Sequence, residues 1–395
     1  MKRQRKGNRR GSTLVLVTTI GVIVAILGMS MIQLGFHSRV MAVRNVESIK
    51  ARAAADAGMV EAIFLMQKKL IDEPIWDNST LPAATDVAAN PDDTGCTFSY
   101  TVDPNGSGWD VTSTGTCSNQ SRTMHARLSV GSYWEGIGVE HEVDVKLGTT
   151  FGVINGVGAD MVIRSNSTAT DALKFKAFVT VPGDVLCGPG GNPETVIDVK
   201  ATTVIEGESY AATETIIFPP ATVPAGTYQA MGTMTTTTTL AGGYYRYDTI
   251  NLGNSQILRI TGPTVLHVIG TTTLNNAAEA IVAPGGSLEI YLGGDLVNQN
   301  SVGFSNETGV ATNLKVYGLP GCTQMDLKAK TDLYAAVYAP SATVNLYNSG
   351  DFYGSLTAES FYMKNSGDFY FDATLATTNI DDAAAVFVVD RWWEG

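Results

Sequence analysis

Side chains able to do chemistry are few and widely spaced in this sequence of 395 residues. Its four histidines are His37, His125, His141 and His267. No two of them form an HExxH pair, and the sequence has neither a GxSxG elbow nor a GKS or GKT phosphate loop. Glu140, His141 and Glu142 are consecutive, but in a strand consecutive side chains point to opposite faces and cannot converge. We therefore expect no catalytic site, no bound metal and no cofactor.

Asp351 and Asp368 are the acidic residues with the most informative spacing. Each lies in a copy of the hexapeptide NSGDFY, at 348–353 and again at 365–370. If the copies stack as successive coils, the carboxyl groups lie about 5 Å apart, which is compatible with paired catalytic carboxylates. An aspartate that follows glycine at a corner more often accepts backbone hydrogen bonds. We expect a turn-forming role for both, with calcium binding and catalysis as alternatives.

Cysteine usage indicates an oxidising compartment. The four cysteines are Cys96, Cys117, Cys187 and Cys322, and no two have CxxC spacing. An even number without that spacing favours two disulfides over a zinc site. Cys96 and Cys117 form the local pair, which leaves Cys187 with Cys322 as a long-range bridge. Buried free thiols are the alternative.

Charge and composition exclude several classes of protein. The chain carries 26 basic and 38 acidic residues, a net charge of −12, although residues 1–11 hold six bases and no acid. The acidic remainder would repel phosphate backbones, which argues against nucleic-acid binding. An apolar fraction of 44% excludes a disordered chain, while 16% charged residues and 41 glycines favour strands and turns.

The N-terminal segment gives the strongest structural signal. Residues 12–36 carry no charge, and a run of this length spans a bilayer as a helix. It is longer than the apolar part of a secretory signal, and the preceding bases favour a cytoplasmic N-terminus. Further apolar residues then recur at spacings of three and four, which predicts that an amphipathic helix continues to residue 71. They are Val40, Val43, Val46, Ile49, Ala53, Ala57, Val60 and Phe64.

Beyond the helix the sequence predicts a mainly β protein. Residues 72–95 lack periodicity and are expected to be a linker. Alternating residues predict a small antiparallel sheet over 96–148, followed by an irregular β region over 149–242. Within that region, Pro219, Pro220 and Pro224, then the threonines at 235–239, indicate a surface crossing.

Internal repeats predict the architecture of the rest. Besides the NSGDFY copies, GPTVLHVIG at 262–270 aligns with GGSLEIYLG at 285–293, and LKVYG at 314–318 resembles the same strand. Short strands with Gly or Asn corners at this period are typical of a β-solenoid. We expect a right-handed β-helix over 243–375 and a C-terminal tail over 376–395. Two face-packed sheets are the alternative.

The aromatic residues of the repeat have two interpretations. Phe352 and Tyr353 recur as Phe369 and Tyr370. Stacked on successive coils, they form ladders that fill the core, which we expect, or an exposed platform for sugars.

The N-terminus resembles a prepilin-type signal of type IV pilins. The shared features are the short basic leader over 1–11, Gly11 before the apolar run, Ser12 after it, and the long helix. The segment AAADAGMVEA at 53–62 makes the likeness closer to PilX-like pilus assembly proteins, in which such a segment closes the helix. The resemblance implies cleavage between Gly11 and Ser12 by prepilin peptidase. A plain, uncleaved signal anchor is the alternative.

One residue departs from that family pattern. Major pilins carry Glu at the fifth mature position, where this sequence has Leu16. Because that carboxylate meets a neighbouring amine in the fibre core, its absence suits a minor or tip subunit.

A second resemblance covers about residues 217–375. It rests on three runs, YRYDTINLG ending at Gly253, PGGSLEIYLGGDL at 284–296 and LYAAVYAPSATVNLYNSGDFYGSL at 333–356. They are similar to the β-helical domain that follows PilX-like N-termini in bacterial surface proteins. The resemblance implies architecture and location, not chemistry.

These observations predict a non-enzymatic, pilin-like minor or tip subunit of a type IV pilus or related surface filament, acting in assembly or adhesion. It would sit in the bacterial inner membrane with its C-terminal region outside the cytoplasm, or on the cell surface once assembled. Expected partners are the inner membrane, prepilin peptidase, other pilin-like subunits and surface glycans. The alternatives are a membrane-anchored β-helix enzyme acting on polysaccharide, and a structural envelope anchor without a pilus.

Overall fold

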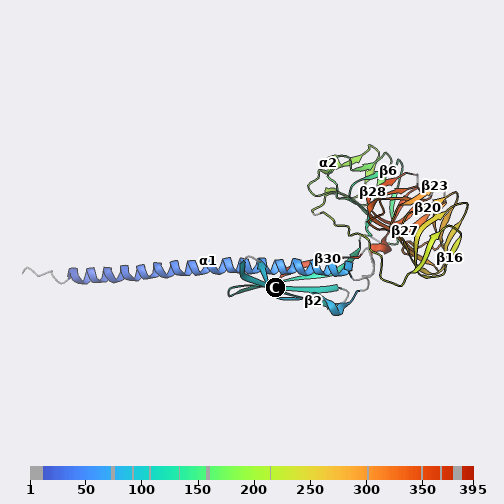
Figure 1. The fold of residues 1–395 in the computed structure, drawn as a ribbon. Helices are drawn as coiled ribbons and strands as arrows, with labels where there is room; N and C mark the ends of the chain where they lie inside the picture. The colour runs from blue at the N-terminus through green and yellow to red at the C-terminus, as the bar shows by residue number, and fades with distance from the viewer. Residues whose placement is uncertain are drawn as a thin grey trace, which may run out of the picture. The chain divides into compact units, whose positions relative to one another are not determined.

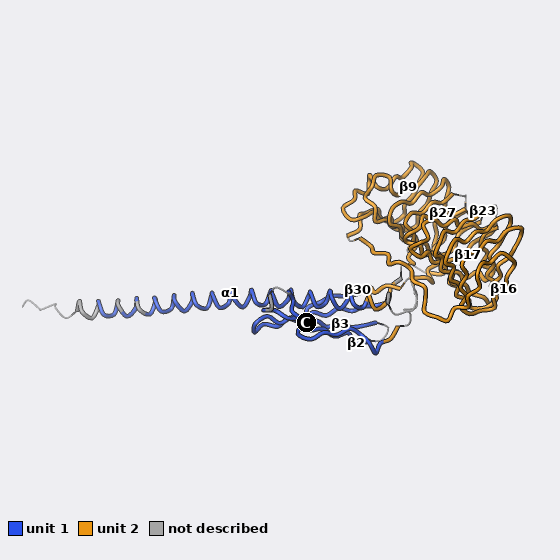
Figure 2. Tube along the Cα trace, viewed as in Figure 1, with its two compact units in different colours: residues 1–66, 78–129, 389–395 blue, residues 67–77, 130–388 orange. Residues whose placement is uncertain are grey.

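The structure is a computed structural model that describes residues 12–72, 76–90, 93–105, 108–132, 134–156, 161–213, 215–299, 302–347, 350–364, 367–376 and 385–395. The chain divides into two compact units, which we describe separately (Figure 2). Unit 1 comprises residues 1–66, 78–129 and 389–395, and unit 2 comprises 67–77 and 130–388. The predicted fold class is confirmed: the protein is mainly β, with one long helix, a small antiparallel sheet and a β-solenoid.

Unit 1 combines the long helix α1 (Ser12–Asp72) with a five-stranded sheet (Figure 1). In sheet order the strands are β1 (Ala84–Asn90), β2 (Asp93–Asn105), β3 (Gly108–Cys117), β4 (Gln120–Ser132) and β30 (Ala385–Glu394). A short 3₁₀ helix, η1 (Asn78–Thr80), precedes them. Strands β1 to β4 form antiparallel pairs between neighbours. The last strand, β30, lies in the predicted C-terminal tail, and β1 lies in the predicted linker. Both were missed because they pair at the edges of the sheet, and local sequence does not reveal that pairing.

Unit 2 is a β-solenoid of about nine turns in which every ladder is parallel. Its first face stacks β14 (Ser209–Ala211), β11 (Asp184–Cys187), β8 (Val162–Ser165), β5 (Gly136–Val139), β28 (Phe352–Met363), β27 (Leu333–Leu346), β25 (Leu314–Gly318), β22 (Ser287–Leu292), β19 (Pro263–Val268), β17 (Gly243–Leu252) and β15 (Gln229–Met234).

The second face continues along the same coils. It stacks β12 (Ile197–Val199), β9 (Leu173–Phe175), β6 (Val143–Val145), then β28 and β27 again, β26 (Gln324–Leu327), β23 (Leu296–Gln299), β20 (Thr272–Asn275), and the ends of β17 and β15.

The third face has two stretches. One contains β13 (Val204–Ile205), β10 (Thr180–Val181), β7 (Phe151–Ile154), β29 (Phe369–Asp372) and the starts of β28 and β27. The other contains β24 (Gly303–Asn306), β21 (Glu279–Val282), β18 (Ile257–Ile260) and β16 (Thr238–Leu240). Three single-turn helices lie at corners: α2 (Pro193–Val196), η2 (Ala311–Asn313) and η3 (Ala373–Ala376).

The order of coils along the solenoid differs from their order in the sequence. Residues 136–211, the N-terminal segment, begin in the middle of the solenoid and wind to one end. Residues 229–372, the C-terminal segment, begin at the other end and wind back to the middle. There the last coil pairs with the first, Leu356 with Ile137 and Phe361 with Val143. We call this junction the seam, and residues 212–228 the connector.

The core runs through the seam without interruption. One inward position can be followed coil by coil through the register of the second face, and every side chain in it is at most 6% exposed. The column consists of Met234, Ile250, Thr272, Leu296, Met325, Val344, Phe361, Val143, Leu173 and Ile197. Val344 and Phe361, which have the same 17-residue spacing as the two NSGDFY copies, are register partners on neighbouring coils. Side chains from both segments therefore build one core.

The strand pairing divides the chain differently from the sequence. Most of the stretch expected to be irregular, 149–242, belongs to solenoid coils, and the small sheet ends at Ser132 rather than 148. The coils of the N-terminal segment were missed because their strands are two to four residues long, too short to show a periodicity.

The connector is the surface crossing that its prolines predicted, and residues 212–213 and 215–228 carry no regular secondary structure. The backbone of Ile216 exchanges two hydrogen bonds with the Asn166 side chain, of 3.0 and 2.7 Å. Further along, Tyr338 donates to the carbonyl oxygen of Pro219 at 2.7 Å. The connector thus lies along the first face, from one segment to the other. The threonines at 238 and 239, expected in the same crossing, belong to β16.

Candidate functional site

The first half of α1 presents an apolar surface. An 18-residue stretch within Val17–Leu70 has a mean hydropathy of 2.1, and none of it is buried. In the described part of the chain, α1 is the one helix long and apolar enough to cross a membrane. Of the predicted processing site, Gly11 lies outside the described residues and Ser12 is the first residue of α1.

The second half of α1 packs against the sheet through small residues. Its buried apolar side chains are Ala51, Ala54, Ala55, Met59, Ala62 and Met66. A Cβ atom on Gly115 would overlap the carbonyl oxygen of Ala51, and one on Gly58 would lie 2.6 Å from Ser113 Oγ. Ser113 also donates a hydrogen bond of 2.7 Å to the carbonyl of Ala55. The segment 53–62 therefore brings helix and sheet backbones close together, and it lies inside a helix that continues to Asp72 rather than closing it.

The opposite face of this half is apolar and uncovered. Val43, Val46, Ile49, Val60 and Phe64, which we call the helix stripe, are 54–69% exposed. They belong to the periodic pattern identified in the sequence. The sheet covers a different face, so this part of α1 has two apolar faces and only one is buried within the chain.

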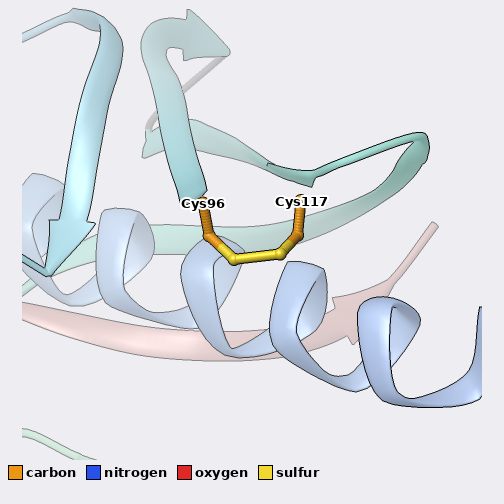
Figure 3. Close-up of a disulfide and its surroundings, with 2 residues drawn as sticks. All are labelled: Cys96 and Cys117. Carbon is orange, nitrogen blue, oxygen red and sulfur yellow. A yellow bond between two sulfur atoms is a disulfide. The ribbon is translucent and has the colours of Figure 1, made fainter. Parts of the chain in front are cut away.

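A groove beside the disulfide adjoins the helix stripe. It has a volume of about 450 Å³, and Val43 and Val46 form part of its wall. Its other lining residues are Ala42, Glu47, Lys50, Gly95, Cys96, Cys117 and Ser118. Cys96 and Cys117 are opposite each other on β2 and β3 and are joined by a disulfide (Figure 3). The disulfide fixes the rim of the groove next to α1.

The end of β30 is tied into unit 1 by charge and ring contacts. Glu394 lies 3.5 Å from Arg52 on α1 and 3.4 Å from Arg122 on β4. The ring of Trp393 stacks on His125 with centroids 5.5 Å apart. The last strand therefore bonds to both the helix and the sheet.

The other two cysteines do not form the expected bridge. Cys187 and Cys322 are free thiols, and neither is exposed. Cys187 belongs to β11 near one end of the solenoid, whereas Cys322 lies between β25 and β26, on the far side of the seam. The permuted coil order separates them. Burial raises the pKa of Cys322 to about 12, so it stays protonated at neutral pH.

The two repeat aspartates bond to backbone. The Asp351 carboxylate accepts the N–H of Asp368 at 2.9 Å, and the Asp368 carboxylate accepts the N–H of Thr150 at 2.8 Å. Asp332, one coil earlier, accepts the N–H of Asp351 at 3.0 Å. Each carboxylate thus holds the start of the next strand, including the strand across the seam. The aspartates accept backbone N–H groups, as expected, but on the next coil rather than within their own turn.

Two further aspartates play the same part and were missed in the sequence. Asp184 accepts the N–H of Glu208 at 2.8 Å. Asp295 accepts those of Thr323 and Gln324 at 2.8 and 2.9 Å, and although burial opposes ionisation, these bonds lower the pKa of Asp295 below its usual range. The shared signal is an aspartate directly before the first buried apolar residue of a strand. It occurs as Asp184–Val185, Asp295–Leu296, Asp332–Leu333, Asp351–Phe352 and Asp368–Phe369.

The repeat aromatics form two ladders. Phe352 and Phe369 stack in the core with centroids 4.8 Å apart. On the outside, Tyr353 stacks between Tyr334 and Tyr370 at 4.6 and 4.9 Å. Burial and the nearby Asp351 carboxylate raise the pKa of Tyr353 to about 12. Because the ring faces cover one another, the ladder offers sugars edges rather than open faces.

Glu140, His141 and Glu142 do not converge. Glu140 accepts a hydrogen bond of 2.8 Å from Asn166, and Glu142 accepts one of 2.9 Å from Tyr362. His141 faces Glu359 at 3.8 Å. Across the residues that the structure describes, no group of three or more His, Cys, Asp or Glu is placed to hold a metal ion.

Comparison with known proteins gives three results. A sequence family described as a domain of unknown function (DUF7305) matches residues 203–378. The chain matches no curated protein. Among solved structures it is similar to the crystal structure of the competence-associated pilin ComZ from Thermus thermophilus, at 11% identity, over 88% of this chain and 97% of that one, with a TM-score of 0.25. The family match begins in the outermost coil of the N-terminal segment, so it contains the whole C-terminal segment but not the first coil that completes the seam.

Proposed function

We propose that this protein is a non-enzymatic, pilin-like subunit held in the bacterial inner membrane by α1. It assembles beside other pilin-like helices, in a minor or tip position of a type IV pilus or a related surface filament, and acts in assembly or adhesion through its solenoid. The observation that carries the proposal is the helix stripe, an apolar face on a helix whose opposite face is already bound to the sheet.

The length of α1 sets where the stripe lies. Its 61 residues extend about 90 Å at 1.5 Å per residue. The hydrocarbon layer is about 30 Å thick and is filled by the first 20 or so residues. The helix stripe, which begins at Val43, therefore lies beyond the lipid tails. Exposed there, it favours a protein partner, since burying one large apolar side chain contributes about 1.5–3 kcal/mol.

The position within a filament follows from Leu16. A subunit with leucine there brings no carboxylate into the apolar bundle to meet a neighbour's terminal amine. Such a subunit fits a filament position where this carboxylate–amine pair is not needed, either at the end of the filament or as a subunit present in few copies.

The test compares two neighbouring substitutions on α1. Val46→Asp adds a charge to the helix stripe, and Asn45→Asp adds the same charge beside it on an exposed position. In cells with an active prepilin peptidase, Val46→Asp should abolish cross-linking to other pilin-like subunits while its membrane level stays unchanged. Asn45→Asp should cross-link like the wild type. Equal cross-linking of the two variants would remove the basis of the proposal.

Processing and activity give two independent checks. The mature chain should begin at Ser12, and Gly11→Glu should leave the full-length chain in the membrane, as measured by N-terminal sequencing. Purified protein should hydrolyse none of a panel of polysaccharides. Turnover that is lost in Asp351→Asn would favour the β-helix enzyme instead.

A further inference from the structure

The two ends of the solenoid expose strand edges without partners. Among the described residues, β12, β13 and β14 each pair on one side, and so do β15 and β16 at the opposite end. We call residues 193–211 end A and residues 229–240 end B. Unpaired N–H and C=O groups in a row form a template for a further strand. Ile216 and Pro219 of the connector bond to the side of the solenoid, at Asn166 and Tyr338, away from both edges.

The register defines what a further strand would meet. On the first face one column of inward residues can be followed from end B to end A. It consists of Gln229, Tyr245, Leu266, Ile290, Val316, Val337, Leu356, Ile137, Ile163, Val185 and Ser209. Every interior member is apolar or aromatic, and the two terminal members, Gln229 and Ser209, are polar and exposed. One more coil at end A would place its residue of this column directly beside Ser209.

The seam shows that such a junction forms without chain continuity. Leu356 and Ile137 pair across it although they are more than 200 residues apart in the sequence. Coils on its two sides keep the same strand direction and the same inward column. Two solenoid segments of this protein thus already stack end to end by parallel pairing, and the connector is what makes the contact intramolecular.

Charge disfavours a contact between two copies of end A. End A carries four carboxylates, Glu194, Asp198, Glu206 and Glu208, against one ammonium, Lys200. End B has no charged residue at all. Two copies of end A would bring like charges together, whereas end A on end B does not.

We propose that two copies of this chain stack through their solenoids, with end A of one copy on end B of the next, in the register that places Ser209 beside Gln229. The strands pair in parallel, β14 with the start of β15; β12 and β13 end one coil before β14 and do not pair with the next copy. A bulge at Gly232, whose φ is +69°, interrupts β15, so its pairing is confined to Gln229 and Ala230. The contact joins different surfaces, so it does not close on itself and repeats along a row of copies. The inference does not rest on the proposed function.

Engineered cysteines test the register directly. Neighbouring parallel strands place paired Cα atoms about 4.8 Å apart, within disulfide range. Full-length protein carrying Ser209→Cys is mixed in detergent with protein carrying Gln229→Cys and oxidised. We expect a disulfide-linked dimer in the mixture and none from either variant alone. The native free thiols, Cys187 and Cys322, are fully buried and supply little background.

The matched control shifts the register by one residue. Tyr210→Cys lies on the same strand, but its side chain points outward, so mixing it with Gln229→Cys should give no dimer. If this pair links as well as the Ser209 pair, or if Ser209→Cys links to itself, the proposed register is wrong. If no mixture links at any concentration, the ends do not stack.

Two substitutions of opposite charge at one residue of end B test which surface it faces. Thr239 is exposed on end B. Thr239→Glu should lower the yield of the Ser209–Gln229 dimer several-fold, because it faces the acidic end A, while Thr239→Lys should keep or raise the yield. Equal losses in both variants would mean that end A is not the surface that faces end B.

Discussion

The two segments of the solenoid build the same ladder from differently patterned sequences. In the C-terminal segment the longest strands, β27 and β28, have 14 and 12 residues, and NSGDFY recurs on successive coils. The N-terminal segment uses strands of two to four residues and shows no recognisable repeat. Yet inward columns cross from one to the other without a break.

The comparison shows that a solenoid can form without the sequence repeats by which it is recognised. A coil needs an apolar residue at each inward position and a corner that holds the next strand. Both segments meet these needs, since Asp184 serves the N-terminal segment as Asp351 serves the other. The repeated NSGDFY hexapeptide occurs where two corner aspartates, Asp351 and Asp368, hold successive coils.

The largest effect is expected from a charge in the shared column. Val344→Asp buries an unpaired carboxylate in a position without exposure and should destabilise the solenoid by several kcal/mol. Thr343→Asp, next to it on the outward side, should cost far less. The buried thiols report on each segment separately, Cys187 on the N-terminal and Cys322 on the C-terminal one. If the ladder is one cooperative unit, both thiols should become reactive at the same urea concentration in Val344→Asp. Reactivity of Cys322 alone would mean that the segments unfold independently.

Corner aspartates should give an intermediate effect. Asp351→Ala removes the acceptor for the Asp368 N–H and should lower stability by about 1–2 kcal/mol. Asp351→Asn keeps a carbonyl oxygen as acceptor and should lower it by less. Asp184→Ala should lower stability by a similar amount if the corner aspartates of both segments contribute equally. Melting should not change when a chelator is added, and a drop in melting temperature there would instead identify calcium at these corners.

The connector should contribute less. Tyr338→Phe removes the hydrogen bond to the Pro219 carbonyl and leaves that oxygen without its partner, at a cost of about 1 kcal/mol. Chemical denaturation measures the difference, and hydrogen exchange locates it. Faster exchange confined to the first face around 216–228 is expected, because the connector lies there. Unchanged exchange would mean that its other contacts hold it without this bond.

The smallest effect concerns mild acid. Burial lowers the pKa of His267, and the nearby Arg246 charge adds to the shift. The centroid of its ring lies 6.2 Å from that of Tyr228, at the end of the connector. The unfolded chain takes up this proton near pH 6.5, before the folded protein does, so stability falls as pH drops below that value. The loss should stay under about 1 kcal/mol and should shrink in His267→Gln. Thermal melts at pH 7 and 5.5 measure it, and the same melts on His267→Gln show how much comes from other titrating groups.

Much of the fold could be predicted because its signals are local. An uncharged run of membrane length, alternating strands and a repeated hexapeptide each depend on neighbouring residues. The aspartate corners followed from glycine and aspartate chemistry, although the shorter form of the motif at Asp184 and Asp295 was missed.

The rest could not be predicted because it depends on partners far away in the sequence. Nothing in residues 385–394 indicates that they pair beside β4, and nothing near Ile137 indicates Leu356 as its neighbour. The predicted Cys187–Cys322 bridge failed for the same reason, since counting thiols cannot show that coils on both sides of the seam lie between these two cysteines, whereas the local Cys96–Cys117 pair was predicted correctly. The helix stripe was identified as an apolar face, but which face the sheet covers depends on Gly115 and the alanines of α1.

The seam also delays the pairing of the first coil while the chain is being synthesised. A ribosome adds roughly 5–20 residues per second, so the strand that pairs with Ile137 is made roughly 10–40 s after it. During that delay the first coil has an open edge and an uncovered apolar interior, on a chain still being synthesised. A truncation before residue 352 would extend this delay without limit. We expect such chains to aggregate or to be degraded, even though residues 136–211 are all present.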